Sequence, residues 1–370
     1  MQSALPIFYT PDGSQNNALY PQRGAMNTPR IRAHPPLHAY IDDYANDDID
    51  SSPLWHHPRL DLPSARRIFV ELFQKVPPRE NERASQLLMY FAHQLVRDMT
   101  RTEMLNETQP WPIECDMVET RGSFCPLGQE SIDFFRAARW PKNDEVGYLP
   151  SNTGEPINCA TTWLDMDHIY GNAPPSSPDY LHFRTGEGGH MKLDSSTHLP
   201  PVDENGKYLV YDDRMRRTPM DLALTATFLH YHNKRADYYL SQNPDWSDET
   251  LFYNARMDVV AVYQSAFEGK YIPALLGEPL SSYDGYDPEV DASIDVFFST
   301  CSFRYGHSGL SSLVRFIDKD WAPIPRDPML LRDVYNHTEE VVNQLGGGRL
   351  AAATVMRGLA HDATKGEFQI

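Results

Sequence analysis

The feature that most constrains the fold is a pair of long helical segments in the second half of the chain. TPMD at 218–221 supplies a hydroxyl cap, a proline at the first helical position and an acid in the first turn. The following run LALTATFLHYHNKRADYYL extends this helix to about residue 241. A second helix follows a Ser247 cap and is predicted to end at Pro273. These segments predict a mainly α fold.

The rest of the chain divides into loop-rich and helical parts. Further helices are predicted near 80–105, 291–316, 328–345 and 349–361, with LGGGRL at 345–350 as a helix break. Residues 1–65 are rich in Pro, Asn, Asp and Tyr without long periodicity, which predicts an extended, wrapping arm. Residues 106–210 are loop-rich. We therefore expect one domain over 1–370, with a helical core at 80–361 and long ordered loops.

Composition and charge narrow the class of partner. The chain has 370 residues and is 41% hydrophobic, enough for a large buried core. Its net charge of −18 argues against nucleic acid or an anionic membrane surface as the main partner. Basic residues do cluster in DDRMRRTP at 212–219, so a buried anionic ligand is compatible with the sequence. No apolar run approaches the roughly 18 residues of a membrane helix, and no signal peptide is visible at the start.

The cysteines do not predict a disulfide scaffold. There are four in the chain, and none of them forms a CxxC pair. Cys115 and Cys125 would be able to bridge in an oxidising compartment, whereas the simpler alternative is buried thiols. The sequence leaves both interpretations open.

The helix that contains YFAHQLVRDM at 90–99 also has two interpretations. An apolar stripe at helical spacing is predicted for Leu88, Phe91, Ala92, Leu95 and Met99. His93 and Arg97 are four residues apart and share the opposite side, where polar side chains commonly meet water. The alternative is that this pair faces a buried reactive site.

Two further segments offer candidate ligands. In TTWLDMDHIYG, the side chains of Thr161, Asp165 and Asp167 and the carbonyl of Trp163 are hard oxygen donors of the kind that calcium prefers. Alternate positions in an extended loop would turn these oxygens to one side, although turn-forming and capping carboxylates explain the same residues.

The second segment is CSFRYGHSGL at 301–310. Its His307 is either a metal ligand or a core histidine satisfied by a carbonyl, and its two glycines would admit a large flat partner or another backbone. His230 and His232 in HYHN lie on different helix faces, which argues against a joint metal site.

Taken in order, eight stretches resemble the animal-type haem peroxidase (peroxidase–cyclooxygenase) superfamily, and look most like the peroxidase-homology domain of dual oxidases. They are DGSQNN at 12–17, LPSAR at 62–66, FAHQLVRDM at 91–99, TTWLDMDHIYGN at 161–172, FLHYHNKRA at 228–236, ARMDVVAVYQ…YIPALLG at 255–277, FRYGH at 303–307 and MRGLA at 356–360. The resemblance covers nearly the whole chain. It implies a mostly helical haem domain with an N-terminal arm.

The resemblance also implies roles for particular residues. His307 matches the axial iron ligand, Arg304 a haem-propionate partner and Arg214 the catalytic arginine. The calcium site of the family matches Asp98, Thr161, the Trp163 carbonyl, Asp165 and Asp167. Asp167 stands where many members have serine, and another oxygen ligand there should preserve or strengthen calcium binding.

The distal helix departs from the family pattern. Active members carry glutamine and, four residues later, histidine, whereas this chain has His93 and Arg97 at those places. Arg97 stays protonated and cannot shuttle a proton, although it would stabilise charge on peroxide together with Arg214. His93 is the remaining base, one helical turn or about 5.4 Å from the usual position. A misplaced base predicts weak catalysis, because general acid–base catalysis is typically worth roughly 10²–10⁴-fold.

Two further departures concern haem attachment. The positions of the family's haem-linking acids fall at Val96 and Arg217, so haem b is expected to be held non-covalently. The chain ends at Ile370, before the segment in which the family supplies an asparagine to the proximal histidine. Either the sequence is a fragment, with the C-terminal part of the family domain missing, or the site has been remodelled. Without that asparagine, the His307 ring would be poorly oriented.

The sequence therefore predicts a peroxidase-like oxidoreductase that uses hydrogen peroxide to oxidise a small reductant, with an NADPH oxidase-type partner domain as a further expectation. The alternative is a catalytically inactive, calcium-stabilised interaction module of an oxidase-like assembly. The resemblance favours an extracellular or secretory-pathway location, and Asn106 and Asn336 begin glycosylation sequons.

Overall fold

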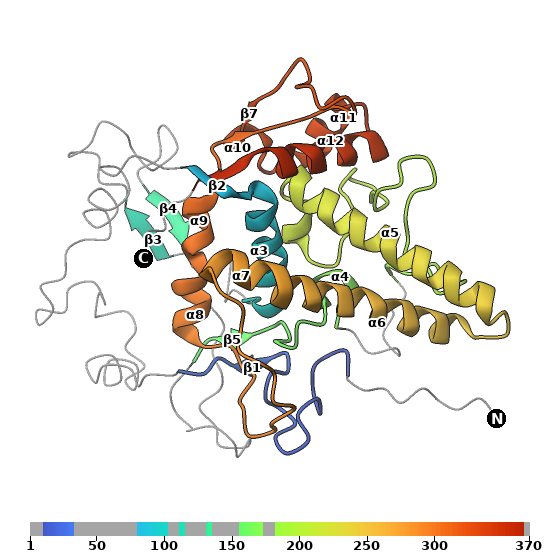
Figure 1. The fold of residues 1–370 in the computed structure, drawn as a ribbon, viewed down its shortest axis with the longest axis vertical. Coiled ribbons are helices and arrows are strands. Elements are labelled where there is room, and N and C mark those ends of the chain that lie inside the picture. Colours follow the sequence, from blue (N-terminus) through green and yellow to red (C-terminus); the bar gives the residue numbers. More distant parts are fainter. Residues whose placement is uncertain are drawn as a thin grey trace, which may run out of the picture.

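The computed structural model describes residues 10–32, 80–102, 155–172 and 182–365, together with the strand residues 111–114 and 131–134. Its architecture is mainly helical, as predicted (Figure 1). The α-helices are α3 (Gln86–Met99), α4 (Asp167–Tyr170), α5 (Pro219–Gln242), α6 (Asp248–Ala266), α7 (Ile272–Leu276), α8 (Val296–Thr300), α9 (Gly306–Gly309), α10 (Leu331–Val334), α11 (Thr338–Gln344) and α12 (Gly348–His361). Two 3₁₀ turns, η4 (Asp213–Arg216) and η6 (Ser302–Tyr305), and one π-turn, η5 (Phe267–Tyr271), complete the helical elements of the described residues.

The strands are short and form four antiparallel pairs. The pairs are β1 (Thr28–Pro29) with β5 (Ile157–Asn158), β2 (Glu80–Ser85) with β8 (Ala363–Lys365), β3 (Trp111–Glu114) with β4 (Ser131–Phe134), and β6 (Leu313–Val314) with β7 (Met329–Leu330). Each pair fastens two segments that are distant in sequence or joined by a loop, and the described strands make no larger sheet.

The two long helices begin where the capping residues predicted. The Asp221 amide donates to Thr218 Oγ1 at 3.1 Å, and Pro219 stands in the first turn of α5. Ser247 caps α6 by accepting from the Thr250 amide at 3.2 Å. α5 and α6 then lie side by side along much of their length (Figure 1).

The predicted end of the second helix at Pro273 is wrong. Helical backbone continues through the π-turn η5 and into α7, and ends at Gly277 in the left-handed conformation. Pro273 lies in the first turn of α7, where a missing N–H costs little.

Three other predicted helices are shorter or interrupted. The helix expected over 80–105 begins only at Gln86, because the preceding residues pair with β8. The stretch 291–316 breaks into α8, η6 and α9, where Gly306 and Gly309 weaken helix propensity. The stretch 328–345 is divided between β7, α10 and α11, with Asn336 in the left-handed region at φ 62°. The helix predicted over 349–361 is confirmed as α12, which follows the glycine-rich break.

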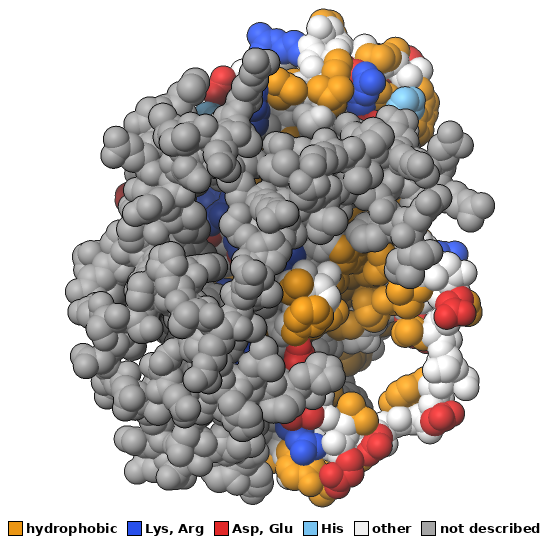
Figure 2. All heavy atoms as spheres, turned by 90° about the vertical axis from the view of Figure 1, so that its left-hand side faces the viewer, with side chains coloured by type: hydrophobic (Ala, Val, Ile, Leu, Met, Phe, Trp, Pro, Cys, Tyr) orange, Lys and Arg blue, Asp and Glu red, His pale blue; other side chains and the backbone are white. Residues whose placement is uncertain are grey.

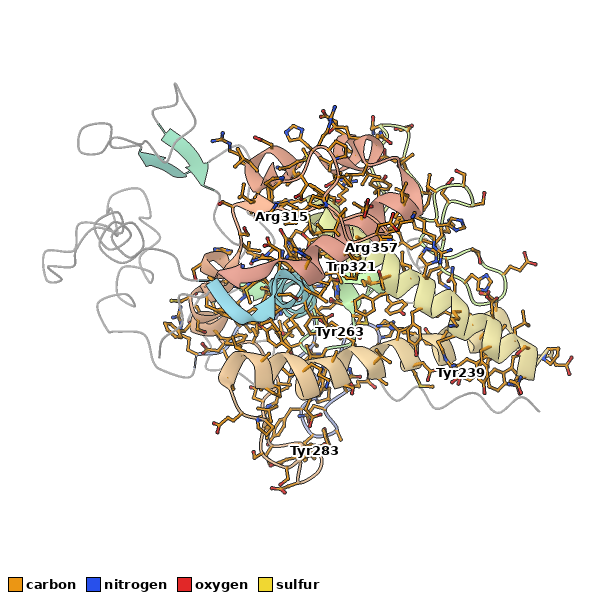
Figure 3. The ribbon with its side chains drawn as sticks, turned by 45° about the horizontal axis from the view of Figure 1, so that its top comes forward. Tyr239, Tyr263, Tyr283, Arg315, Trp321 and Arg357 are labelled. Carbon is orange, nitrogen blue, oxygen red and sulfur yellow. The ribbon has the colours of Figure 1, made fainter. Side chains whose placement is uncertain are left out.

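α3 lies at the centre of the molecule, between α5, α6, α9 and α12 (Figure 1). Its buried residues occupy every side of the helix, namely Gln86, Met89, Tyr90, Ala92, Gln94, Leu95, Val96 and Asp98. On one side, Tyr263 points from α6 toward α3 and packs against Phe91 (Figure 3). α3 is therefore a core helix and has no solvent-facing side.

The described part of the predicted arm runs in turns along the body of the molecule. Asn17 Nδ2 donates to the Pro288 carbonyl at 2.8 Å, and the Thr162 amide donates to the Gly24 carbonyl at 3.0 Å. Gly24 has φ 76°, and a β-carbon there would lie 2.7 Å from Trp163 Nε1. The glycine thus lets the segment lie against the tryptophan. The rest of the predicted arm is outside the described residues.

Hydrophobic side chains gather on the described part of the face shown in Figure 2. No helix in the described ranges has the length and apolar character required to cross a membrane.

Cys159 is a buried thiol and Cys301 an exposed one, whereas Cys115 and Cys125 lie outside the described side chains.

Candidate functional site

His93 and Arg97 of α3 converge on a buried acid of α5. His93 Nδ1 lies 3.4 Å from Asp221 Oδ1, and Arg97 Nη2 lies 3.6 Å from Asp221 Oδ2. The Asp221 side chain is fully buried, and those of His93 and Arg97 are only 20% and 11% exposed. The solvated-face interpretation of this helix is therefore wrong.

Asp221 is fixed by the cap of its own helix. Thr218 Oγ1 donates to Asp221 Oδ2 at 2.9 Å. Burial raises the pKa of the Asp221 carboxyl, but Arg97, His93 and Thr218 outweigh this effect and hold the pKa below its usual value. Asp221 therefore carries a negative charge at neutral pH. The sequence predicts Asp221 only as an acid in the first turn of the helix, because its partners on α3 are remote along the chain.

The first turns of α3 hold α9 in place. Gln86 Nε2 donates to the Gly309 carbonyl at 3.1 Å, and Gln86 Oε1 accepts from the Ser311 amide at 3.3 Å. A β-carbon at Gly309 would lie 2.4 Å from Met89 Sδ, so a glycine is needed for this close approach. The close neighbour of Gly309 is thus a side chain of α3, which places the FRYGH segment next to the distal helix.

His307 lies in the first turn of α9 and is exposed. Within the described residues, no hydrogen bond to its ring is found, so the core-histidine alternative has no carbonyl partner there. Partial burial, followed by the positive charges of Arg304, His93 and Arg97, lowers the pKa of the imidazole. The neutral ring is the form that binds a metal ion. The structure therefore brings His307 into one region with His93 and Arg97.

Arginines are concentrated in the same region. Burial lowers the pKa of Arg304, and the charges of Arg214 and Arg97 lower it further. The pKa of Arg30 is also lowered, by burial and then by Arg304 and Arg214, and its Nε is buried without a hydrogen-bond partner. Cations held this close together favour an anionic ligand among them.

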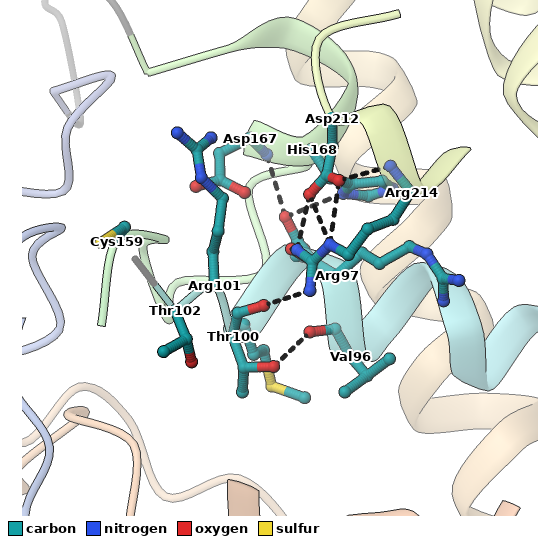
Figure 4. Close-up of polar contacts among 12 residues, drawn as sticks. Val96, Arg97, Thr100, Arg101, Thr102, Cys159, Asp167, His168, Asp212 and Arg214 are labelled. Carbon is teal, nitrogen blue, oxygen red and sulfur yellow. Dashed lines mark hydrogen bonds and ion pairs between the residues drawn. The ribbon is translucent and has the colours of Figure 1, made fainter. Parts of the chain in front are cut away.

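Arg214 fastens the C-terminal end of α3 (Figure 4). Its Nη1 donates to the Thr100 carbonyl at 2.8 Å, and its Nη2 donates to the Arg97 carbonyl at 3.1 Å. The remaining face of the guanidinium pairs with Asp212, with Nε 2.9 Å from Oδ1. The predicted catalytic arginine thus lies one helical turn beyond the His93–Arg97 pair, with most of its donors engaged.

Four of the five predicted calcium ligands come together, namely Asp98, Thr161, Asp165 and Asp167. Thr161 Oγ1 donates to Asp165 Oδ1 at 2.8 Å, and the Thr161 amide donates to Asp167 Oδ2 at 2.9 Å. The Asp167 amide donates to Asp98 Oδ1 of α3 at 2.9 Å. All four residues are buried. The loop therefore docks on α3 through one cluster of carboxylates.

The loop reaches this arrangement by sharp turns, so the expectation of an extended segment is wrong. Leu164 and Met166 have φ values of 51° and 61°, in the left-handed region. α4 then begins at Asp167. The side chain of Trp163 packs against the N-terminal segment at Gly24.

Excess negative charge makes this cluster suitable for a cation. Burial and then Asp98 raise the pKa of Asp165 to about 6, against the opposing charge of Arg256. Burial, Asp98 and Asp165 raise the pKa of Asp167 well above its usual value. Oδ2 of Asp98 and Oδ2 of Asp165 are buried without a hydrogen-bond partner. Three carboxylates beside one buried arginine leave a charge that a divalent ion would neutralise.

His168, to which neither the spacing nor the family resemblance gave a role, adjoins this cluster. Its side chain is fully buried, with Nδ1 3.2 Å from Asp98 Oδ1 and Nε2 3.0 Å from Gln94 Oε1. A histidine directly after the candidate ligand Asp167 was a visible signal. By contrast, His230 and His232 bond to separate partners, His198 O for the first and Tyr170 Oη and Gly189 O for the second.

Comparisons with known proteins agree with the resemblance. The family model described as animal haem peroxidase matches residues 8–369. Thyroid peroxidase of Mus musculus is 25% identical over 399 residues, covering 96% of this chain and 43% of that protein. Dual oxidase of Drosophila melanogaster is 27% identical over 324 residues, covering 80% of this chain and 20% of that protein.

A solved structure supports the fold. Peroxidase A of Dictyostelium discoideum matches with a TM-score of 0.78 at 22% identity, covering 96% of this chain and 68% of that chain. The chain spans less than half the length of the two curated relatives above.

Proposed function

The chain belongs to the animal haem peroxidase family, and on that premise we propose that it is a haem-binding, peroxidase-like oxidoreductase. It would use hydrogen peroxide to oxidise a small electron donor, with weak turnover. The observation that carries the proposal is the exposed imidazole of His307, whose lowered pKa favours the neutral form, beside a group of arginines.

The residues of this region fit haem b. His307 would hold the iron, and Arg304 would pair with a propionate. A β-carbon at Gly306 would have no heavy atom within 4 Å, which agrees with open space beside the histidine. Val96 is a buried apolar residue and Arg217 a base, so neither would form an ester, and we propose non-covalent binding.

When bound, haem would supply the redox-active iron that peroxide chemistry requires. The side chains of the protein would accept protons and stabilise negative charge. Asp221 faces His93 Nδ1 and favours the tautomer that carries hydrogen there, which leaves Nε2 able to accept a proton. The 3.4 Å contact is long for a hydrogen bond, as catalytic contacts often are before a substrate binds.

The two arginines would act through their positive charge. Arg97 remains protonated and would stabilise negative charge on peroxide, although Asp221 already neutralises part of its own charge. Arg214 would add to the field from the end of α3, since its guanidinium is engaged by Asp212 and by backbone carbonyls. This division of roles is consistent with weak turnover.

The contact between Arg97 and Asp221 favours a second candidate function. If that pair neutralises the distal side, the domain would serve as a non-catalytic module, stabilised by calcium, in an oxidase-like assembly. The relative named dual oxidase supports an NADPH oxidase-type partner domain for either function. We also propose an extracellular or secretory-pathway location, for which the exposed Asn336 offers a glycosylation site.

Haem titration followed by a peroxide assay separates the two functions. We expect a Soret band that saturates at one haem per chain, followed by slow, peroxide-dependent oxidation of a small phenol. The measurements are absorption spectra and initial rates, with free haem at the same concentration as the control. A saturable band without turnover above free haem would favour the non-catalytic module, and no saturable band would contradict haem binding.

We further propose that the cluster of Asp98, Thr161, Asp165, Asp167 and the Trp163 carbonyl binds a divalent cation, calcium by resemblance to the family. Charge balance supports this assignment, because the carboxylates outnumber the neighbouring arginine. The ion would join the loop at 161–167 to α3 and so stabilise the helix that carries His93 and Arg97.

Removal of calcium is expected to lower the melting temperature. An ion present at 100 times its dissociation constant contributes about 2.7 kcal/mol, which corresponds to a shift of roughly 3–4 °C in a chain of this size. The measurement is thermal unfolding in EGTA and after calcium is restored. An Asp165→Asn variant should lose most of the response, and an unchanged melting temperature in the wild-type protein would remove these residues from a structural calcium site.

A further inference from the structure

Both ring nitrogens of His168 lie close to oxygen atoms of polar side chains on α3. Gln94 Oε1 lies 3.0 Å from Nε2, and Asp98 Oδ1 lies 3.2 Å from Nδ1. A neutral imidazole has only one N–H. If Nε2 donates to Gln94, the lone pair of Nδ1 faces a carboxylate oxygen. A cation must then lie near Nδ1, and it is either a proton on the ring or a metal ion.

The surroundings of His168 fit a metal ion. Asp98, Asp167 and His168 each offer one ligand atom, and these atoms lie within 4.8 Å of one another. Oδ2 of Asp98 and Oδ2 of Asp165 are also buried and without a hydrogen-bond partner, so further ligand atoms remain available. Residues Asp98, Asp165, Asp167 and His168 are at most 3% exposed.

Gln94 has the position of an outer partner. Histidines that bind metals almost always donate their other ring nitrogen to an oxygen, which fixes the tautomer and the ring orientation. Gln94 Oε1 provides that acceptor for Nε2, and Gln94 itself is fully buried on α3. The competing arrangement reverses the Gln94 amide, so that its nitrogen donates to Nε2 and Nδ1–H donates to Asp98. That arrangement would hold no metal at the histidine.

We propose that His168 is a ligand of the cation in this cluster and makes the cluster a mixed nitrogen–oxygen site for a first-row divalent ion such as Mn²⁺ or Zn²⁺. Calcium prefers ligands that are all oxygen, whereas imidazole suits first-row ions. The inference deepens the proposed cation site and rests on it. His168 is not among the residues for which the family resemblance implied a role in calcium binding.

Pulsed electron paramagnetic resonance of Mn²⁺ bound to the metal-stripped protein tests the ligand directly. A histidine ligand gives coupling of the manganese electron spin to ¹⁴N, and this result is expected for the wild-type chain. His168→Gln should remove the coupling and weaken Mn²⁺ binding at least about 10-fold, because even outer-shell changes cost roughly 10–100-fold. Calcium binding should change much less.

His232→Gln is the matched control, because His232 is equally buried and hydrogen-bonded at both ring nitrogens but lies outside the cluster. It should keep both the coupling and the Mn²⁺ affinity. Bound Mn²⁺ without ¹⁴N coupling in the wild-type chain would overturn the proposal, as would calcium binding without any Mn²⁺ or Zn²⁺ binding. If neither calcium nor Mn²⁺ binds or raises the melting temperature, the cation site itself fails, which is a different result.

Discussion

Replacing His307 with alanine is expected to abolish the sharp Soret band of the haem-loaded protein and to weaken haem binding at least about 100-fold. The magnitude follows from the roughly 10–100-fold cost of removing even an outer partner of a metal ligand. His307 is exposed, its pKa is lowered, and no hydrogen bond to its ring is found in the described residues. Its loss should therefore remove the proposed iron ligand and disturb little else.

The measurement is an absorption titration with haem, with circular dichroism to show that the fold is retained. His337→Ala is the control, because His337 is also on the surface, with a side chain 58% exposed and 3.8 Å from Glu340. It should bind haem like the wild-type chain. An unchanged Soret band and affinity in His307→Ala would exclude this histidine as the iron ligand.

Replacing Arg97 with histidine is expected to raise peroxide-dependent oxidation by at least about 10-fold, since general acid–base catalysis is typically worth roughly 10²–10⁴-fold. The new imidazole would occupy the place at which active members of the family carry their distal base. Asp221, 3.6 Å from Arg97, would remain as a carboxylate partner able to orient it. Arginine at this position cannot accept a proton.

The comparison should use initial rates at equal haem loading. Arg97→Gln removes the same positive charge without adding a base, so it should show no comparable gain. The expected order of rates is Arg97→His above wild type, with Arg97→Gln at or below wild type. A haem-loaded Arg97→His protein without a gain would count against an impaired peroxidase and in favour of the non-catalytic module.

Local signals in the sequence were sufficient for the helices that begin with strong caps. Thr218 and Ser247 start α5 and α6 because a capping hydroxyl and the backbone amides it satisfies are only three residues apart. Local signals did not predict the structure of residues 291–316 correctly. One helix is predicted there, but Gly309 is required for the contact with Met89 of α3, which no local pattern reveals.

In the candidate site, too, some features could be predicted from the sequence and others could not. The resemblance gave roles to His307, Arg304 and the carboxylates at 98, 165 and 167, and in the structure these residues form two groups that both adjoin α3. It gave no role to Asp221 or His168. Both residues acquire their chemistry from partners on α3, and for His168 and Gln94 the separation along the chain is 74 residues. Such contacts are products of the tertiary fold, so spacing within a short motif does not predict them.

The burial of α3 on every side also limits how this protein can change over time. A helix with a water-facing side can accept many substitutions there at little cost in stability, whereas α3 has buried residues on every side. Arg97 faces the acid of α5, and the next residue, Asp98, faces the loop at 161–167. A change that rotates or shifts the helix to suit one side would disturb the other. Remodelling of the distal pair and of the cation cluster is thus expected to proceed by compensating changes in α5 and in the loop, with few independent replacements on α3 itself.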